Sequence, residues 1–367
     1  MRKCYTKDMK VFIVPSFPYK GNDSSYRFAQ NLVDVLYQHG NVCAISAPKE
    51  AKFHHASLYP CLLPKSPIFS NLQGKIRSYE DWLYRCGYTN PDYLENDVEQ
   101  LCEAFKEFLP DLILDYGRPS AIMAARKSDI PVISYITGAI YRERPVHKKA
   151  ITSLNETLSR LKLEQVLRYT DLLNYSNRRI VFGSSLLQPL PEEIDVDRFG
   201  TYLAPMEKKD LAIHVGAFFP ELNRSATTIR SVMEEAFVGA PYEVTLSFPN
   251  ARIASNQNIN TQSSFRSDLI VDCSVVIHDG SDYIYQQALQ HGIPQIVVSD
   301  GSWQRSWIAS SVKRNGLGVQ VLEEEFSVSS IYEAYRRVVS DDYYTVQAET
   351  FAKDVKRLQS IEQLIIL

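Results

Sequence analysis

The stretch that most restricts how this chain can fold runs from residue 268 to residue 321. An apolar run over 273–277 ends at the polar turn 278–281, and a second apolar run over 295–298 follows a helix-like stretch and a Gly-Ile-Pro break. Short apolar runs separated by a helical stretch are typical of buried parallel strands. We therefore predict one strand–turn–helix–strand unit. The first N–H groups of its helix have no partner inside the helix, so this turn is a candidate anion site.

The same alternation continues along the rest of the chain. Residues 9–15 predict a strand, residues 26–39 predict a helix that ends at Gly40, and residues 41–46 predict a second strand. Together these three elements make another βαβ unit. Residues 51–91 lack a clear period, so we expect loops and short helices there. We expect further strands at 111–115, 131–135, 179–183, 211–216 and 242–248, and further helices at 97–108 (capped by Asn96), 118–127, 150–173, 227–236, 265–271 and 345–367.

The stretch around Pro205, with the charged sequence MEKKD, indicates a linker between two halves of the chain. A length of 367 residues is enough for two domains, each with its own core. We predict an α/β protein with an N-terminal domain over 1–205 and a C-terminal domain over 206–344. The last helix, 345–367, is expected to pack back on the N-terminal domain.

Composition excludes several function classes. The formal net charge is −3, which gives no general attraction for nucleic acid or anionic membranes. No apolar run approaches the roughly 18 residues of a membrane-spanning helix, and the N-terminal run VFIV is too short for a signal peptide. The six cysteines are scattered without metal-ligand spacing, so we expect reduced thiols, no metal and a cytoplasmic location.

Four segments, in order along the chain, resemble one family. They are IVPSFPYKGNDS (13–24), YLAPM (202–206), IHVGAF (213–218) and VVIHDGSDYIYQQALQHGIPQIVVSDGSWQ (275–304), the last continued by RNGLGVQV. Together they resemble the bacterial, macrolide-type branch of the UDP-glycosyltransferases. The long final segment is the most specific, because it resembles the family's ordered donor signature. The resemblance implies a GT-B fold, in which two Rossmann-like domains face each other across a cleft.

The resemblance implies that the C-terminal domain binds a nucleotide-diphosphate sugar, of UDP or dTDP type, and that the reaction needs no other cofactor. His278 and the N–H groups of Gly280 and Ser281 are expected at the diphosphate, and Gln304 matches the glutamine that binds donor-sugar hydroxyls. The helix dipole from Asp282 onward adds favourable charge. The remaining expected donor-site residues are His214, Gly216, Ala217, Phe265 and Trp303.

The expected catalytic base departs from the family pattern. The family's histidine, which takes the proton of the acceptor hydroxyl, is replaced here by Asn22, and an amide is not a base at neutral pH. Asp23 is adjacent and acts as a base if burial raises its pKa. Asp115 matches the aspartate that orients the family histidine, and it is the other candidate base.

The donor motif also departs from the pattern. Asp279 stands in place of the first glycine, Tyr283 in place of a serine or threonine, and Trp303 in place of the aspartate before Gln304. A carboxylate at position 279 repels a diphosphate unless it points away.

Each of these residues also has a structural interpretation. In that interpretation His278 and His214 merely form hydrogen bonds at strand ends, Asp23 caps a helix and Asp115 caps a loop. Trp303 and Trp307, four residues apart, fit packing better than sugar stacking.

The leading hypothesis is an inverting, metal-independent glycosyltransferase that acts on a hydroxyl of a small-molecule or lipid-like acceptor. The acceptor is expected to bind along the aromatic-rich stretch 51–91, with the chemistry in the cleft. One alternative is a catalytically silent homologue that binds or activates a partner protein, as the replaced histidine suggests. A further alternative is a nucleotide-sugar epimerase on the same fold.

Overall fold

The chain divides into two compact units, each with its own sheet. Unit 1 comprises 1–182, 188–202 and 359–367, and unit 2 comprises 183–187 and 203–358. The computed structural model describes residues 9–16, 23–65, 75–142, 144–203, 213–220, 222, 224–249, 251–263, 266 and 268–365. The predicted domain limits at 205/206 and 344/345 remain predictions.

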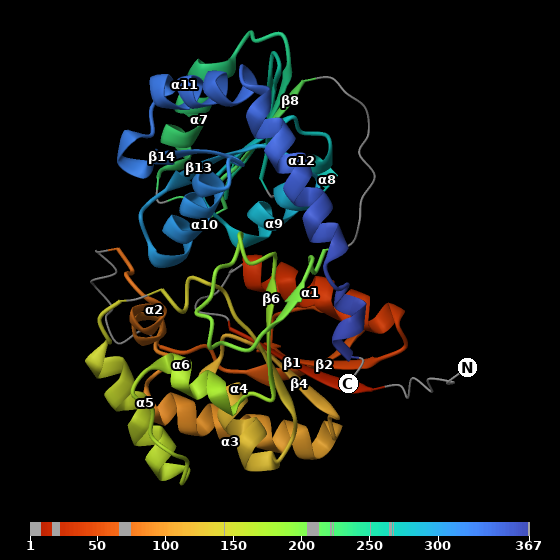
Figure 1. Cartoon of the computed structure of the whole chain (residues 1–367), viewed down its shortest axis with the longest axis vertical. Coiled ribbons are helices and arrows are strands. Elements are labelled where there is room, and N and C mark those ends of the chain that lie inside the picture. Colours follow the sequence, from red (N-terminus) through yellow and green to blue (C-terminus); the bar gives the residue numbers. More distant parts are fainter. Residues whose placement is uncertain are drawn as a thin grey trace. The chain divides into compact units, whose positions relative to one another are not determined.

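Unit 1 contains a parallel sheet in the order β3-β2-β1-β4-β5-β6-β7 (Figure 1). The chain moves outward from β1 to β3 and then crosses back to β4, so the connections diverge between β1 and β4. In open α/β sheets ligands bind at the carboxyl ends of the strands on either side of this switch point. The strands are β1 (Lys10–Pro15), β2 (Val42–Pro48), β3 (Ala56–Cys61), β4 (Leu112–Tyr116), β5 (Val132–Tyr135), β6 (Arg178–Phe182) and β7 (Asp197–Phe199).

Amphipathic helices cover this sheet. In α3 the buried residues Leu94, Val98, Leu101 and Phe105 recur at helical spacing, and the ring of Phe105 meets that of Phe12 on β1 edge to face. Figure 1 shows α1 on one face of the sheet and α3 and α4 on the other. The helices are α1 (Asp23–Gln38), α2 (Tyr79–Cys86), α3 (Pro91–Phe108), α4 (Pro119–Ser128), α5 (Lys148–Arg160), α6 (Tyr169–Leu172), η1 (Leu173–Tyr175) and η3 (Ile361–Ile365).

Unit 2 repeats this plan, with strand order β10-β11-β9-β8-β12-β13-β14. Its switch point lies between β8 and β12, and only the β10–β11 pair is antiparallel within the described part of the sheet. The strands are β8 (His214–Phe218), β9 (Glu243–Ser247), β10 (Ala254–Asn256), β11 (Ile259–Gln262), β12 (Val275–His278), β13 (Gln295–Ser299) and β14 (Gly318–Leu322). The helices are α7 (Ala226–Phe237), α8 (Asp268–Val271), α9 (Asp282–Gln290), α10 (Trp303–Arg314), η2 (Glu323–Glu325), α11 (Val328–Val339) and α12 (Asp342–Arg357).

Several expected elements differ in the structure. Residues 56–61 form the edge strand β3, which the sequence pattern hides because it contains Pro60 and is only partly buried. Helix α3 begins at Pro91 with Asn90 as its cap, so Asn96 lies inside the helix and the predicted start at 97 was wrong. The predicted helix 150–173 is broken after Arg160, because Lys162 adopts a left-handed conformation.

The last α-helix is also shorter than the predicted helix 345–367. Helix α12 ends at Arg357 and packs on α9 and α11, all within unit 2. After it, η3 contacts α1 in unit 1.

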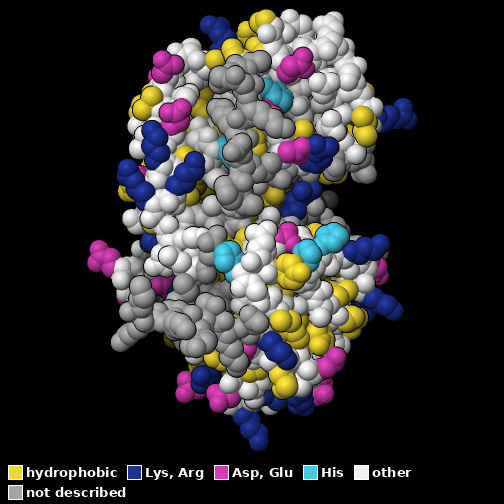
Figure 2. Space-filling model, turned by 90° about the vertical axis from the view of Figure 1, so that its right-hand side faces the viewer, with side chains coloured by type: hydrophobic (Ala, Val, Ile, Leu, Met, Phe, Trp, Pro, Cys, Tyr) yellow, Lys and Arg dark blue, Asp and Glu magenta, His cyan; other side chains and the backbone are white. Residues whose placement is uncertain are grey.

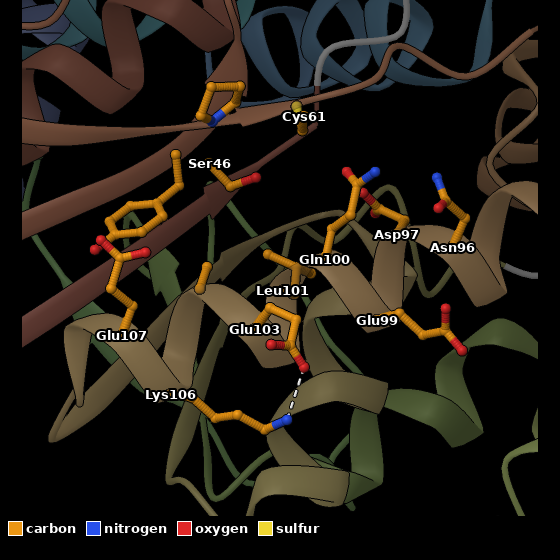
Figure 3. Close-up of a pocket in the computed structure, with 13 residues that line it drawn as sticks. Ser46, Cys61, Asn96, Asp97, Glu99, Gln100, Leu101, Glu103, Lys106 and Glu107 are labelled. Carbon is orange, nitrogen blue, oxygen red and sulfur yellow. Dashed lines mark hydrogen bonds and ion pairs between the residues drawn. The ribbon is translucent and has the colours of Figure 1, made fainter.

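A buried ion pair in unit 1 connects α3, the start of α4 and β2. Arg118, which precedes α4, binds both carboxylate oxygens of Asp97 on α3, and its Nη1 donates to Oγ of Ser46 on β2 at 3.0 Å. The hydroxyl of Ser120 donates to the same carboxylate. Ser46 and Asp97 are among the residues that line a groove between β3 and α3 (Figure 3). The volume of this groove is about 730 Å³.

We expect Arg118→Ala to lower the free energy of unfolding of unit 1 by about 3–5 kcal/mol, because it leaves the Asp97 carboxylate buried without its cation. Arg126→Ala, the same change at an exposed position of α4, should cost about 1 kcal/mol or less. Urea denaturation measures both. If Arg118→Ala unfolds within 1 kcal/mol of the parent chain, the pair does not hold these elements together.

Candidate functional site

The turn after β12 is held by the side chain of His278, which is fully buried. The backbone N–H of Gly280 donates to Nδ1 of His278 at 3.2 Å, so Nε2 carries the ring proton and donates to Oε1 of Gln295 at 2.9 Å. Burial lowers the pKa of His278 to about 4, and the ring is therefore neutral at pH 7. Both ring nitrogens are engaged within unit 2, which makes His278 a support for the turn in this structure.

Asp279, also fully buried, closes the same turn. Its Oδ1 accepts the N–H of Ser281 at 3.1 Å, and Gly280 between them has a φ of +82°, a conformation that favours glycine. The N–H groups of Gly280 and Ser281, which the sequence assigns to a diphosphate, are thus bonded inside the turn. The carboxylate of Asp279 accepts the N–H of Ser281. Direct contacts of these N–H groups with a diphosphate therefore remain a prediction.

The neighbouring strand β13 ends in a turn of the same design. Oδ1 of Asp300 accepts the N–H of Ser302 at 2.8 Å, Oγ of Ser299 accepts that of Gly301 at 3.2 Å, and Gly301 has a φ of +76°. Because β12 and β13 are adjacent and parallel, two Asp-Gly-Ser turns lie side by side at one edge of the sheet. The repeat of Asp-Gly-Ser at 279–281 and 300–302 was the available signal in the sequence.

Arg305 connects the two turns, and the sequence reasoning missed it. It lies in the first turn of α10, and a Cβ built on Gly280 would lie 3.1 Å from Cβ of Arg305. Its Nη1 is 3.5 Å from Oδ2 of Asp300, and its side chain is 14% exposed. The base of the Arg305 side chain therefore lies against the first turn, and its guanidinium lies beside the second.

The three expected donor-site residues of β8 lie before the carboxyl end of that strand, and their donor contacts remain predictions. His214 is the first residue of β8, at the edge opposite the carboxyl end, where its Nε2 meets Oγ1 of Thr245 at 2.8 Å and burial lowers its pKa. Gly216 and Ala217 lie inside the strand, opposite Val276 and Ile277 of β12. A Cβ on Gly216 would lie 2.6 Å from Sγ of Cys273, so this glycine serves packing. These positions precede the strand end because β8 extends to Phe218.

The other expected donor residues lie at the predicted edge where they are described. Asp282 is the first residue of α9 and is buried, and Trp303 and Gln304 begin α10 as partly buried side chains. Phe265 lies outside the described residues.

In unit 1 the structure places Asp115 near the carboxyl end of β4, at the switch point. Its Oδ1 accepts the N–H of Arg118 at 2.9 Å and its Oδ2 accepts the hydroxyl of Ser134 at 2.8 Å. Asp115 is only 2% exposed, and burial raises the pKa of its carboxyl to about 7 despite these hydrogen bonds. Asp23 begins α1, but its side chain is not described, and Asn22 lies outside the described residues.

Aromatic side chains surround this end of β4. The ring of Tyr116 stacks on Phe28 of α1 at 3.9 Å between centroids and on Tyr135 of β5 at 4.8 Å. From the stretch expected to contact the acceptor, the hydroxyl of Tyr79 on α2 donates to the carbonyl of Gly117 at 2.7 Å. This contact brings α2 beside the turn that follows Asp115.

Within the described ranges, no group of three or more His, Cys, Asp or Glu side chains is arranged to hold a metal ion. None of the described helices is both long and apolar enough to cross a membrane. Acidic and basic side chains are interspersed on the face shown in Figure 2, in keeping with the small net charge.

Comparison with known proteins points to one group. Residues 258–359, which include both Asp-Gly-Ser turns, match the model of the erythromycin biosynthesis protein CIII-like C-terminal domain. The chain is 25% identical to the NDP-glycosyltransferase YjiC of Bacillus subtilis (strain 168) over 299 residues, which cover 72% of this chain and 74% of that protein.

Solved glycosyltransferase structures share the fold of the whole chain. The kitacinnamycin glycosyltransferase superposes with a TM-score of 0.75 at 16% identity, covering 98% of both chains. The glycosyltransferase VinC in complex with dTDP superposes with a TM-score of 0.69 at 14% identity, covering 97% of this chain and 98% of that one. The predicted GT-B fold and the predicted resemblance are confirmed: the chain is a homologue of the NDP-glycosyltransferase YjiC, has an EryCIII-like C-terminal domain at residues 258–359, and shares the GT-B fold of solved antibiotic glycosyltransferases.

Proposed function

We propose that this protein transfers a sugar from a dTDP- or UDP-sugar to a hydroxyl group of a small-molecule or lipid-like acceptor. The observation that carries the proposal is the position of the family match. It covers β12, α9, β13 and α10, whose turns lie beside the switch point of the unit 2 sheet, where doubly wound sheets bind ligands.

The donor is proposed to bind to unit 2 with its diphosphate at the N-termini of α9 and α10. Both helices present a positive dipole end at the same edge of the sheet. His278 contributes by fixing the turn, since its two ring nitrogens hold Gly280 and Gln295. In support, the VinC, SsfS6 and SpnG glycosyltransferases, which share this fold, have been solved with thymidine diphosphate. Trp303 and Gln304 begin α10 next to this position and are the proposed contacts of the donor sugar.

The acceptor is proposed to bind to unit 1, with Asp115 as the general base. In the proposed reaction the acceptor oxygen attacks the anomeric carbon, the bond from that carbon to the diphosphate oxygen breaks, and the nucleoside diphosphate leaves with the electron pair. The hydroxyl proton passes to the carboxylate of Asp115. A carboxyl with a pKa of about 7 is suited to this transfer at neutral pH. Direct displacement inverts the configuration, and in this scheme the helix dipoles stabilise the leaving group without a metal ion.

A second candidate function is a catalytically silent homologue that binds a partner protein. Two observations favour it: the carboxylate of Asp279 accepts the N–H of Ser281 inside the donor turn, and Asn22 replaces the family's histidine. Nucleotide binding separates the two candidates.

We expect dTDP or UDP to stabilise the full chain against heat, because a ligand at 100 times its Kd adds about 2.7 kcal/mol to the folded state. Thymidine and uridine, which lack phosphates, should give much smaller shifts at the same concentration. Differential scanning fluorimetry followed by titration calorimetry measures this. A melting temperature unchanged by dTDP, UDP and GDP would exclude the donor site and favour the silent homologue.

We expect Asp115→Asn to lower kcat/KM by about 10²- to 10⁴-fold, the range for loss of a general base. In the parent chain kcat/KM should rise with pH through about 7, because only the deprotonated carboxylate accepts a proton. This inflection should disappear in Asp115→Asn.

The matched control is Asp129→Asn, an exposed aspartate at the C-terminus of α4 whose left-handed conformation asparagine tolerates. It should retain parent activity. Loss of activity in Asp23→Asn together with an active Asp115→Asn would instead assign the base to Asp23.

A further inference from the structure

The carboxyl group of Asp115 lies away from solvent, so a proton that it accepts needs a route out of unit 1. The residue is 2% exposed, and burial raises the pKa of its carboxyl to about 7. A general base must lose its proton before the next reaction, because only the ionised carboxylate accepts another. The hydrogen-bond partners of the carboxyl determine where that proton goes.

Among the described partners of the carboxyl, the hydroxyl of Ser134 has the chemistry of a proton relay. The backbone N–H groups of Gly117 and Arg118 only donate. The hydroxyl of Ser134 donates to Oδ2 of Asp115 at 2.8 Å, and its oxygen also accepts hydrogen bonds. Ser134 on β5 is fully buried and lies directly opposite Asp115 of β4, so the pairing of the two strands fixes this contact.

Ser176 continues the chain of hydrogen bonds toward solvent. Its Oγ lies 2.7 Å from Oγ of Ser134, and either hydroxyl can be the donor. Ser176 is partly exposed, and it precedes β6, whose first residue pairs with Ile133 of β5. Two hydroxyls therefore connect the buried carboxyl of Asp115 to the surface of unit 1, on the side where β6 begins.

The other charged and titratable neighbours of Asp115 keep one charge state at neutral pH. The guanidinium of Arg118 pairs with Asp97. Burial raises the pKa of Tyr79 and that of Tyr169 well above the ordinary value, so both phenols stay neutral. Within this group of described residues, a titration near pH 7 therefore reports on the carboxyl of Asp115.

We infer that Ser134 and Ser176 form a relay that carries the proton from Asp115 to solvent after each transfer. In the ionised state Ser176 donates to Ser134, and Ser134 donates to Oδ2 of Asp115. Once Oδ2 carries the proton, the direction reverses: this proton passes to Oγ of Ser134, the hydroxyl proton of Ser134 passes to Oγ of Ser176, and that of Ser176 passes to water. Each hydroxyl gives up one proton and gains one, and the carboxylate is restored.

This inference rests on the proposed function, in which Asp115 is the base, and it adds two positioning residues that act through it. Because Ser176 precedes β6, the exit lies away from the carboxyl edge where the acceptor is proposed to bind. The proton can then leave while the product is still bound. The simpler interpretation, in which the hydroxyls only hold β5 against the segment before β6, predicts no change in proton exchange when Ser176 is replaced.

The test observes the carboxyl of Asp115 by NMR in the full-length chain, isotopically labelled at aspartate Cγ, and needs neither donor nor acceptor. The signal is identified by its absence in Asp115→Asn. In the parent chain it should move as one averaged signal through a titration near pH 7, because the relay exchanges the proton rapidly. Ser176→Ala should leave the pKa of Asp115 almost unchanged, since the Ser176 hydroxyl bonds to Ser134. It should slow proton exchange about 10²-fold, the lower end of what one positioned proton-transfer group contributes.

Three further variants separate the relay from a structural role. Ser176→Thr keeps the hydroxyl and should restore the exchange rate of the parent chain. Ser128→Ala removes another partly buried hydroxyl of unit 1, one that contacts Cys102, and should behave like the parent. Ser134→Ala should slow exchange and also raise the pKa of Asp115, because it removes a hydrogen bond to the ionised carboxylate. Since Ser176 is partly exposed, Ser176→Ala decides the question even if Ser134→Ala does not fold.

Parent-like exchange in Ser176→Ala would mean that the proton leaves by another route, and the inference is overturned while the proposed function stands. Separate signals for the two forms of the carboxyl in the parent chain would overturn it as well, because they show slow exchange. A carboxyl that is still fully ionised well below pH 7 would instead defeat Asp115 as the base of the proposed function, and the relay with it.

Discussion

One hydrogen bond recurs at three of the described turns that lead from a strand toward a helix, those after β4, β12 and β13. An aspartate at the strand end accepts a backbone N–H just beyond it: Asp115 from Arg118, Asp279 from Ser281, and Asp300 from Ser302. Each bond satisfies a backbone donor that is otherwise hard to pair at a sharp change of direction. The same bond places a carboxyl group at the edge of the sheet where open α/β sheets generally bind ligands. In unit 1, burial raises the pKa of the Asp115 carboxyl. In unit 2, Arg305 pairs with the carboxylate of Asp300.

Most of the fold follows from local pattern, because buried strands and amphipathic helices are determined by which residues avoid water. That is why the parallel βαβ units of both sheets could be predicted. The edge strand β3 could not, since a partly exposed strand with Pro60 lacks the apolar run of a central strand. The break after Arg160 was not predicted either. The side chain of Asn155 holds the backbone of Val166, eleven residues later, and the local sequence pattern does not contain this contact.

The position of the candidate site could be predicted from the sequence, but the orientation of its side chains could be predicted less well. Chain order alone places Asp279, Trp303 and Gln304 at one edge, since adjacent parallel strands end together. The direction of the His278 ring depends on Gln295, a residue of the next strand, and no local pattern contains that contact. The predicted strand 211–216 puts His214 near its end, whereas β8 covers His214–Phe218, because strand limits depend on pairing with β9 and β12. Arg305 escaped because a single cation early in a helix resembles an ordinary surface residue.

The hydroxyl of Tyr79 holds the carbonyl of Gly117, and a Cβ on Gly117 would lie 2.5 Å from that hydroxyl oxygen. The contact joins α2 to the backbone two residues after Asp115. In the proposed reaction, a compound that shifts α2 as it binds would therefore also shift the polar groups around this carboxyl. Recognition of the acceptor and the readiness of Asp115 to take a proton would then be coupled within unit 1.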